Sequence, residues 1–261
     1  MILFGRRILI TGVVNTDSIA FAVAQRAQAL GANLMLTAFP RDRSLTEQAA
    51  ARLDHPVPIV DLDVTDPDGY AVVGERIAEE FGQLDGALHA VAFAPRDALG
   101  GQMTDAVPES VNLSFQTSVF SLAQLAGLCR DHAPEEGASV VALGFHASGA
   151  WPTYNWMGVC KSALESTTRY LARDMGPSGI RVNVVSSGPM HTRAAGGIEG
   201  FEQLLEAWEV GAPMHWDALD PLPVADAVCF LMSRMSRAIS GEVLHVDGGF
   251  HAMAAPLRSA A

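Results

Sequence analysis

A tyrosine and a lysine seven residues apart are the two residues of this chain best placed to do chemistry together. Tyr154 and Lys161 fall within a stretch whose pattern predicts a helix over residues 154–174. Seven steps of about 100° return to within about 20° of the starting face, so both side chains can point into one cleft. A nearby ammonium favours phenolate, which predicts a lowered Tyr154 pKa and a group able to stabilise developing negative charge. Taken alone, the spacing also suits a half-buried tyrosine and a solvated lysine.

Lys161 also stands out in the composition, because it is the only lysine among 17 basic residues. The others are arginines, an excess that codon bias can explain. A compact ammonium that meets vicinal hydroxyl groups is not freely replaced by the planar guanidinium of arginine. The retained lysine therefore indicates a site at which an ammonium is needed.

Length and composition restrict the class of protein. The chain has 261 residues, of which 49% are hydrophobic and 18% charged, so it can bury a sizeable core and is not a disordered chain. Its net charge of -12 argues against a nucleic-acid partner. The 3 cysteines form no CxxC pair, which argues against a disulfide framework or a zinc site and fits a reducing compartment. We see no run of the ~20 apolar residues of a membrane helix and no signal peptide, so we expect a cytoplasmic protein without a membrane partner.

Short apolar runs alternate with longer amphipathic stretches along the chain. The apolar runs predict strands at residues 7–11, 33–37, 57–62, 87–91, 138–144, 181–186 and 242–246. The stretches between them predict helices at residues 19–30, 45–53, 69–81, 107–130, 154–174 and 223–235. Because the strands are apolar throughout, we expect a parallel sheet covered on both faces. The predicted fold class is α/β, a single Rossmann-like, doubly wound domain over residues 1–261 that binds ligands at the carboxyl ends of its strands.

Residues 191–216 interrupt this alternation and form the best candidate for a lid. The apolar side chains of this segment include Ile198, Phe201, Leu204, Leu205 and Trp208. Positions 201, 204, 205 and 208 lie on one helical stripe. The stripe suits either a helix packed on the core or a lid over an apolar ligand.

The loop after the first strand has the features of a phosphate-binding turn, although a GxGxxG motif is absent. Gly12 permits a tight turn from strand to loop, and Asp17 or Ser18 can cap the following helix. The amide groups at the start of that helix can then hold a pyrophosphate. The same residues also suit an ordinary connection between a strand and a helix.

The next two strands end in residues that suit an adenosine. The second strand leads to Phe39, whose ring offers an apolar face for adenine, and Arg41 and Arg43 follow. The acidic residue that usually selects NAD is missing here, so the sequence does not separate NAD from NADP. After the third strand, Asp63 can accept from the adenine amino group while Val64 packs on the ring. Asp63 can equally cap the next helix.

Several short motifs together give the chain a family resemblance. They are DSIAF at residues 17–21, LDV at 62–64, FAP at 93–95, YNWM at 154–157, KSALES at 161–166, SGPMHT at 187–192 and VDGG at 246–249. With these motifs the chain resembles the short-chain dehydrogenase/reductase superfamily, and within it the NADH-dependent enoyl-[acyl-carrier-protein] reductases of the actinobacterial and mycobacterial type. Ordinary members of the superfamily place the lysine four residues after the tyrosine, where this chain has Gly158. The longer spacing therefore favours the enoyl reductases.

The resemblance implies a hydride transfer to a trans-2-enoyl thioester in fatty-acid or related acyl biosynthesis. Tyr154 would donate a hydrogen bond to the thioester carbonyl and stabilise the enolate that forms once hydride reaches the β-carbon. Lys161 would hold the hydroxyl groups of the nicotinamide ribose, and Phe145 would lie beside the nicotinamide. The implied cofactor is NADH, with NADPH as the alternative, and no metal is needed.

The resemblance also implies two sets of binding residues and an assembly. The dinucleotide would be held by Gly12, Ser18, Ile19, Phe39, Asp63, Val64, Ala90, Ala92, Lys161, Gly188, Pro189, Met190 and Thr192. The acyl substrate would be held by Phe93, Tyr154, Met157, Ile198, Phe201, Leu204, Leu205 and Trp208. The implied partners are an acyl thioester, carried by acyl carrier protein or coenzyme A, and further copies of the chain in a homotetramer.

Some positions depart from the family pattern. Ala90 and Ala92 replace serine and glycine on the loop that touches the cofactor, and Gln116 and Thr117 replace histidine and an aliphatic residue. These changes keep open a redox-silent cyclase or isomerase on the same scaffold. A non-catalytic nucleotide sensor is a further alternative, although a sensor needs no tyrosine–lysine pair. The lid is acidic, and no basic patch for an acidic carrier protein is visible in the sequence.

Overall fold

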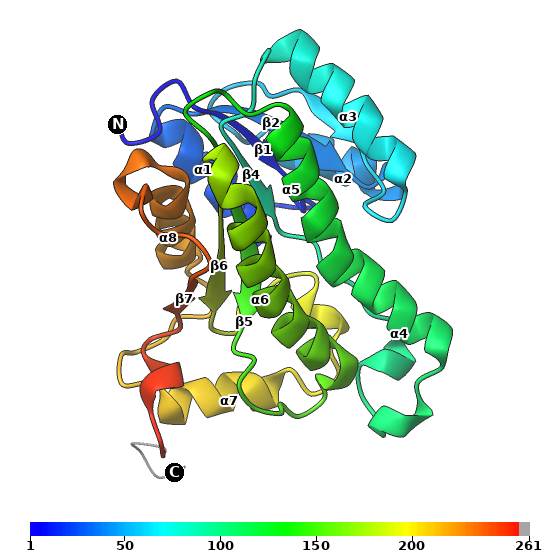
Figure 1. Cartoon of the computed structure of the whole chain (residues 1–261). Coiled ribbons are helices and arrows are strands. Elements are labelled where there is room, and N and C mark those ends of the chain that lie inside the picture. The colour runs from blue at the N-terminus through cyan, green and yellow to red at the C-terminus, as the bar shows by residue number, and fades with distance from the viewer. Residues whose placement is uncertain (256–261) are drawn as a thin grey trace.

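A single parallel sheet forms the centre of the computed structural model, which describes residues 1–255 (Figure 1). Its strands are β1 (Arg7–Ile10), β2 (Asn33–Ala38), β3 (Ile59–Asp61), β4 (Gly86–His89), β5 (Ser139–Phe145), β6 (Arg181–Ser187) and β7 (Val243–Val246). They lie in the order β3-β2-β1-β4-β5-β6-β7, and every neighbouring pair is parallel. The predicted Rossmann-like, doubly wound α/β fold is confirmed.

Helices cover both faces of this sheet. They are α1 (Ile19–Ala29), α2 (Arg43–Ala50), α3 (Pro67–Glu80), α4 (Pro108–Phe115), α5 (Ser121–Asp131), α6 (Asn155–Met175), α7 (Glu202–Gly211) and α8 (Leu222–Met232). The core on one face is built with α1 and α8, and the core on the other face with α3, α5 and α6 (Figure 1). Within residues 1–255, no helix combines the length and the apolar character needed to cross a membrane.

The first strand shows why the sheet needs two covered faces. Ile8 and Ile10 point into the core that contains α1 and α8, whereas Leu9 points into the opposite core. Each of the three side chains is at most 1% exposed. Side chains alternate between the two faces of a strand, so an uninterrupted apolar run is stable only where both faces are buried. Each such burial contributes about 2 kcal/mol.

The strand order reverses at β1, which pairs with β2 on one side and β4 on the other. At its carboxyl end Ile10 lies opposite Leu36 of β2 and Leu88 of β4. The loops that leave β1 and β4 therefore turn to opposite sides of the sheet. This reversal opens a crevice at the carboxyl ends of the strands, where such folds bind ligands.

Most predicted elements match the observed ones to within three residues at each end, and two differences have a clear physical cause. The strand expected over residues 57–62 is shortened to Ile59–Asp61, because Pro56 and Pro58 have no amide hydrogen for the sheet. The helix expected over residues 107–130 is interrupted by a π-helical turn, Gln116–Phe120, between α4 and α5. Such turns occur often at functional sites because they displace side chains from the regular helical positions.

The lid segment forms its own apolar layer. Helix α7 lies beyond the carboxyl ends of β5 and β6 (Figure 1). Its buried side chains join a third apolar cluster with Phe145, Tyr154 and Met157, separate from the two cores of the sheet. The segment therefore closes over the end of β5 and the start of α6.

Candidate active site

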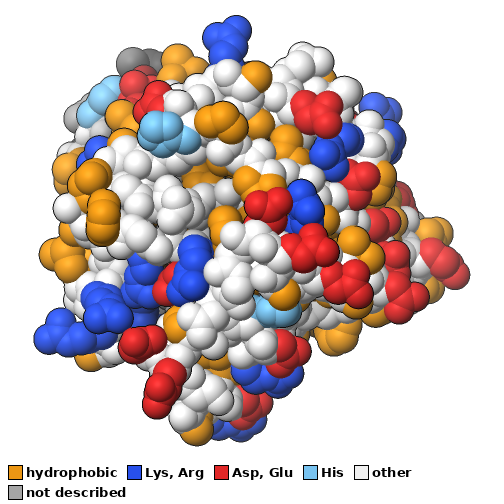
Figure 2. Space-filling model, turned by 90° about the horizontal axis from the view of Figure 1, so that it is seen from above, with side chains coloured by type: hydrophobic (Ala, Val, Ile, Leu, Met, Phe, Trp, Pro, Cys, Tyr) orange, Lys and Arg blue, Asp and Glu red, His pale blue; other side chains and the backbone are white. Residues whose placement is uncertain are grey.

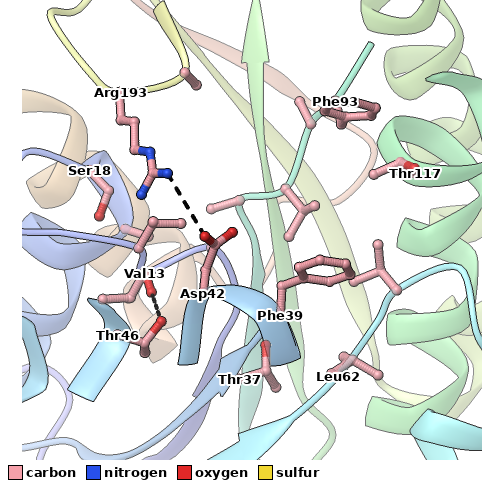
Figure 3. A pocket seen from close by; sticks show the side chains of 18 of the residues that line it. Val13, Ser18, Thr37, Phe39, Asp42, Thr46, Leu62, Phe93, Thr117 and Arg193 are labelled. Carbon is pink, nitrogen blue, oxygen red and sulfur yellow. Dashed lines mark hydrogen bonds and ion pairs between the residues drawn. The ribbon is translucent and has the colours of Figure 1, made fainter. Parts of the chain in front are cut away.

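A cavity of about 470 Å³ lies at the carboxyl ends of β1 to β4. Most of the predicted dinucleotide residues line it, namely Gly12, Ser18, Ile19, Phe39, Asp63, Val64, Ala90, Ala92 and Thr192. The predicted substrate residue Phe93 lines it as well. Figure 3 shows Phe39 and Phe93 on the walls of this cavity and Ser18 at the start of α1. The structure therefore brings together loops that are far apart in the sequence.

Gly12 brings the first loop close to the loop after β4. Its φ of +83° lies in the left-handed region that favours glycine. A Cβ atom at this position would collide with the backbone carbonyl of Ala90. The amide of Ala90 is fixed in turn, because it donates to the Thr11 hydroxyl at 3.0 Å. Gly12 is thus required for this close approach as well as for the turn.

The start of α1 presents amide groups to the cavity. Ser18, and not Asp17, caps the helix, since its hydroxyl accepts from the Phe21 amide at 3.3 Å. Asp17 instead accepts from the Asn15 side chain at 3.2 Å. The amides of Ile19 and Ala20 have no backbone partner within the described part of the chain. The partial positive charge of a helix N-terminus makes these amides suitable for a pyrophosphate.

An ion pair joins the lid to the loop after β2 across the cavity mouth. Arg193 lies 3.8 Å from Asp42, as the dashed line in Figure 3 shows. Beside it the Arg41 guanidinium lies 5.3 Å from the centre of the Phe39 ring. Arg43 is occupied elsewhere, by Asp61 at 2.7 Å. Of the two arginines that follow β2, only Arg41 faces the cavity.

Asp63 keeps one carboxylate oxygen available on the cavity wall. Its Oδ1 accepts from the amide of Thr65 at 2.9 Å and from the Thr65 hydroxyl at 2.7 Å. The cap of α3 is Asp66, so Asp63 does not serve as the helix cap. The second oxygen of Asp63 can accept a hydrogen bond from an amino group next to Val64.

The π-helical turn holds the loop after β4. The Ser118 hydroxyl accepts from the Phe93 amide at 3.0 Å and donates to the Phe93 carbonyl at 3.2 Å. Thr117 lines the cavity, whereas Gln116 points to the Thr65 carbonyl at 3.0 Å. The two unusual residues of this turn therefore do different things, and only Thr117 can meet a ligand in this cavity.

Lys161 does not line the cavity itself, but its ammonium contacts a residue that does. Its ammonium donates to the carbonyl of Leu143 at 3.0 Å, and Leu143 itself lines the cavity. The side chain is buried, and this burial lowers the pKa of Lys161 to about 8. One of its three hydrogens is committed to Leu143, which leaves two for ligand hydroxyl groups.

Tyr154 immediately precedes α6 instead of lying inside it. The residues on either side, Thr153 and Asn155, have φ values of 61° and 34°, an uncommon conformation for residues with side chains. The prediction of a lowered Tyr154 pKa is wrong: burial raises the pKa of the Tyr154 phenol above its ordinary value. The phenol therefore stays protonated at ordinary pH, and it can act as a hydrogen-bond donor.

The predicted nicotinamide residues do not line the cavity. Gly188, Pro189 and Met190 are buried after β6. A Cβ atom on Gly188 would meet the rings of Trp208 and Trp216. The Pro189 carbonyl accepts from the Trp216 indole at 2.8 Å. Gly188 and Pro189 are thus packed against the indoles of Trp208 and Trp216, outside the lining of the cavity.

Phe145 packs against both Tyr154 and Trp208. Its ring centre is 5.2 Å from that of Tyr154 and 5.3 Å from that of Trp208. The remaining predicted substrate residues Met157, Ile198, Phe201, Leu204, Leu205 and Trp208 all belong to the same apolar cluster or pack against it. The sequence placed these residues together correctly, except that Phe93 lies on the dinucleotide side.

Comparison with known proteins agrees with this geometry. The family model described as "Enoyl-(Acyl carrier protein) reductase" matches residues 12–251. The chain belongs to this family. It is 38% identical to the enoyl-[acyl-carrier-protein] reductase [NADH] of Mycolicibacterium smegmatis, covering 95% of this chain and 97% of that protein. It is 36% identical to the NADH enzyme of Escherichia coli, with 95% of each chain covered, and 35% identical to an NADPH enzyme of Staphylococcus aureus, covering 94% and 96%.

Four residues near the site of this enoyl reductase family member were not predicted from its sequence. Trp151 and Phe250 pack on the lid tryptophan, and Asp42 and Leu143 line the cavity. A signal for Trp151 was its position three residues before Tyr154. Phe250 gave no such signal, because it comes from the far end of the chain and reaches the site only through the fold.

Proposed function

We propose that this protein is an NADH-dependent enoyl-[acyl-carrier-protein] reductase that reduces the double bond of trans-2-enoyl thioesters. The observation that carries the proposal is a buried Lys161 whose ammonium contacts Leu143 on the cavity wall, on the helix that directly follows a buried, protonated Tyr154. The spacing of the pair and the membership of the family support the same activity. Fatty-acid synthesis or a related acyl pathway is the process that needs such a step.

The residues of the cavity fit a nicotinamide dinucleotide. The free amides at the start of α1 suit its pyrophosphate, the Phe39 ring and Asp63 suit its adenine, and Lys161 suits a ribose diol. NADH would supply the hydride when bound. Arg41, which the cavity exposes beside Phe39, also suits a ribose 2′-phosphate, so NADPH is the second cofactor that we propose.

Two side chains would act directly on the substrate and cofactor. Tyr154 would donate its hydroxyl hydrogen bond to the thioester carbonyl oxygen and so stabilise the negative charge that develops there. Lys161 would orient the ribose through its free hydrogens and add a positive charge to the local field. Phe145 would shield the reacting atoms from water, since it is 8% exposed and packs on Tyr154. Residues 191–216 would act as the lid of this single domain.

The carrier and the assembly are also proposals. Phe115, which precedes the π-helical turn, and Phe120, which ends it, are 46% and 52% exposed, which supports burial of this surface in a homotetramer. In Figure 2 acidic side chains gather mainly on the right of the face and several basic ones at the lower left, and these are arginines because Lys161 is buried. A surface with several arginines would attract the acidic acyl carrier protein through complementary charge. Free, buried Cys129, Cys160 and Cys229 support a cytoplasmic location.

One assay tests the proposed reaction. Purified protein is mixed with NADH and a trans-2-enoyl thioester, first on coenzyme A and then on acyl carrier protein, and the loss of NADH is followed. We expect turnover with NADH. Comparing kcat/KM between the two carriers then shows which one the enzyme prefers. If folded protein that binds NADH consumes neither NADH nor NADPH with any enoyl thioester, the redox function is wrong and a redox-silent reaction on this scaffold takes its place.

A further inference from the structure

Four aromatic rings fill the space next to the catalytic tyrosine. Trp151 lies 5.7 Å from Phe145, 5.0 Å from Trp208 and 5.5 Å from Phe250, between ring centres. Trp208 and Phe250 stack at 4.0 Å with an angle of 13° between their planes. We call Trp151, Trp208 and Phe250 the aromatic wall. The wall joins three distant segments, the β5–α6 loop, the lid helix α7 and the C-terminal turn after β7 (Figure 1).

Each ring of the aromatic wall is held in place. The Trp151 indole donates to the His146 carbonyl at 2.7 Å, and the Trp208 indole donates to the Asp247 carbonyl at 3.1 Å. Phe250 sits where a side chain at position 211 would stand, because a Cβ atom on Gly211 would lie 2.6 Å from its ring. Moving a ring therefore breaks a hydrogen bond or a close fit. The wall is a fixed part of the site.

The position of the aromatic wall determines which side chains a bound acyl group would contact. The thioester has to reach the Tyr154 hydroxyl, whose ring is covered by Phe145. Beyond Phe145 the next side chains are Trp151 and Trp208. The inward face of α7 offers no groove there, since Leu204 and Trp208 are each 1% exposed. A long acyl chain that extends from the reacting carbons along α7 would need the space that the rings occupy.

Of the three rings, Trp151 is the one that can limit the length of the acyl chain without being needed for the stability of the fold. It is only half-buried, and its carbonyl accepts from the Tyr154 amide at 3.4 Å, so it lies next to the catalytic tyrosine. Trp208 is fully buried within the lid and supports it. We propose that the aromatic wall restricts this enzyme to 2-enoyl thioesters with short acyl groups, and that Trp151 is the specificity-determining residue. The proposal rests on the proposed reductase function.

The test compares chain lengths in wild type and variants. Wild type should reduce but-2-enoyl-CoA with a kcat/KM about 100-fold above that for dodec-2-enoyl-CoA, since each methylene that fails to fit costs a substantial factor. Trp151→Ala should shift this ratio toward the long substrate by about tenfold or more, and Phe250→Ala should shift it in the same direction. Trp156→Leu is the matched control, because the Trp156 indole also donates to a backbone carbonyl, that of Met103 at 3.1 Å, but it belongs to no ring pair of the wall. Its ratio should not change.

A binding measurement keeps the two proposals separate. Calorimetric titration with butanoyl-CoA and dodecanoyl-CoA, in the presence of NAD⁺, reports the chain-length preference without any turnover. Preference for the short chain that weakens in Trp151→Ala supports the wall even if no reduction occurs, in which case the reductase function alone fails. Equal or better use of the long chain by wild type, or an unchanged ratio in folded Trp151→Ala and Phe250→Ala, overturns the specificity role.

Discussion

Lys161 donates a hydrogen bond at 3.0 Å to the carbonyl of Leu143, a residue that itself lines the dinucleotide cavity. The bond ties the helix that follows Tyr154 to the end of β5. The charge of Lys161 is sensitive to pH, because burial lowers its pKa to about 8.

NADH affinity should fall as the pH rises through about 8, because the ammonium form that binds the ribose loses its proton there. The dissociation constant should be flat below that pH and rise by at most about tenfold per pH unit above it. Fluorescence titration of NADH from about pH 7 to about pH 10 measures this. In Lys161→Met the affinity should be weak and independent of pH. His89 cannot cause such a change, since burial lowers its pKa to about 3. A wild-type affinity that stays constant over the range would contradict the role of Lys161.

Removal of the Tyr154 hydroxyl should slow reduction and leave cofactor binding intact. Tyr154→Phe keeps the ring that packs on Phe145 and loses only the donor, so we expect kcat/KM to fall by about 100-fold to 1,000-fold. The dissociation constant for NADH should remain close to that of wild type. Tyr170→Phe, on the exposed side of α6, serves as the control and should retain full activity. Equal kinetics in both variants would remove Tyr154 from the chemistry.

Gly12→Ala should destabilise the fold and weaken NADH binding, because the added methyl group meets the Ala90 carbonyl and the φ of +83° is strained for alanine. Gly82→Ala separates the two causes, since Gly82 has a φ of +71° but nothing near its missing side chain. We expect about 1 kcal/mol of lost stability for Gly82→Ala and about 2–4 kcal/mol for Gly12→Ala by urea denaturation. Equal losses would show that the contact with Ala90 has no energetic weight.

Arg41→Ala should reduce affinity for NADPH more than affinity for NADH. The Arg41 side chain is 78% exposed, with a 3.6 Å ion pair to the neighbouring Asp42, and can turn toward a 2′-phosphate. One charge-assisted hydrogen bond corresponds to roughly tenfold in affinity. Arg43→Ala removes the same charge two residues away, but that side chain is held by Asp61 and Glu47. The ratio of the two dissociation constants should therefore change only in Arg41→Ala. A similar change in both variants would point to net charge instead of a specific contact.

The fold was predictable because its signals are local and repeated. Most strands are apolar runs, the segments between them have helical patterns, and their alternation leaves one topology class. The placement of Gly12, Ser18 and Asp63 on the cavity was also predictable, since Gly12 and Asp63 follow a strand closely and Ser18 begins the next helix. The π-helical turn was not, because it depends on Ser118 binding the Phe93 backbone from another segment.

The electrostatics of the catalytic pair could not be predicted from spacing. The sequence places Lys161 on the same helical face as Tyr154, and the charge of lysine argues for a lower tyrosine pKa. Burial has the opposite effect and outweighs it, so the phenol pKa is raised. Burial depends on Phe145, the lid and the aromatic wall, which meet only in the folded chain. The packing of the predicted acyl-binding residues into one buried apolar cluster could not be predicted for the same reason.

The single lysine also has a practical consequence. In the whole chain, amine-reactive reagents have only one side chain to modify, and it is the buried Lys161. A mass increase at that residue would report directly on how often Lys161 becomes accessible to solvent. Bound dinucleotide would suppress the increase in proportion to its occupancy. The protein thus carries a built-in chemical probe of its own cofactor site, without any engineered label.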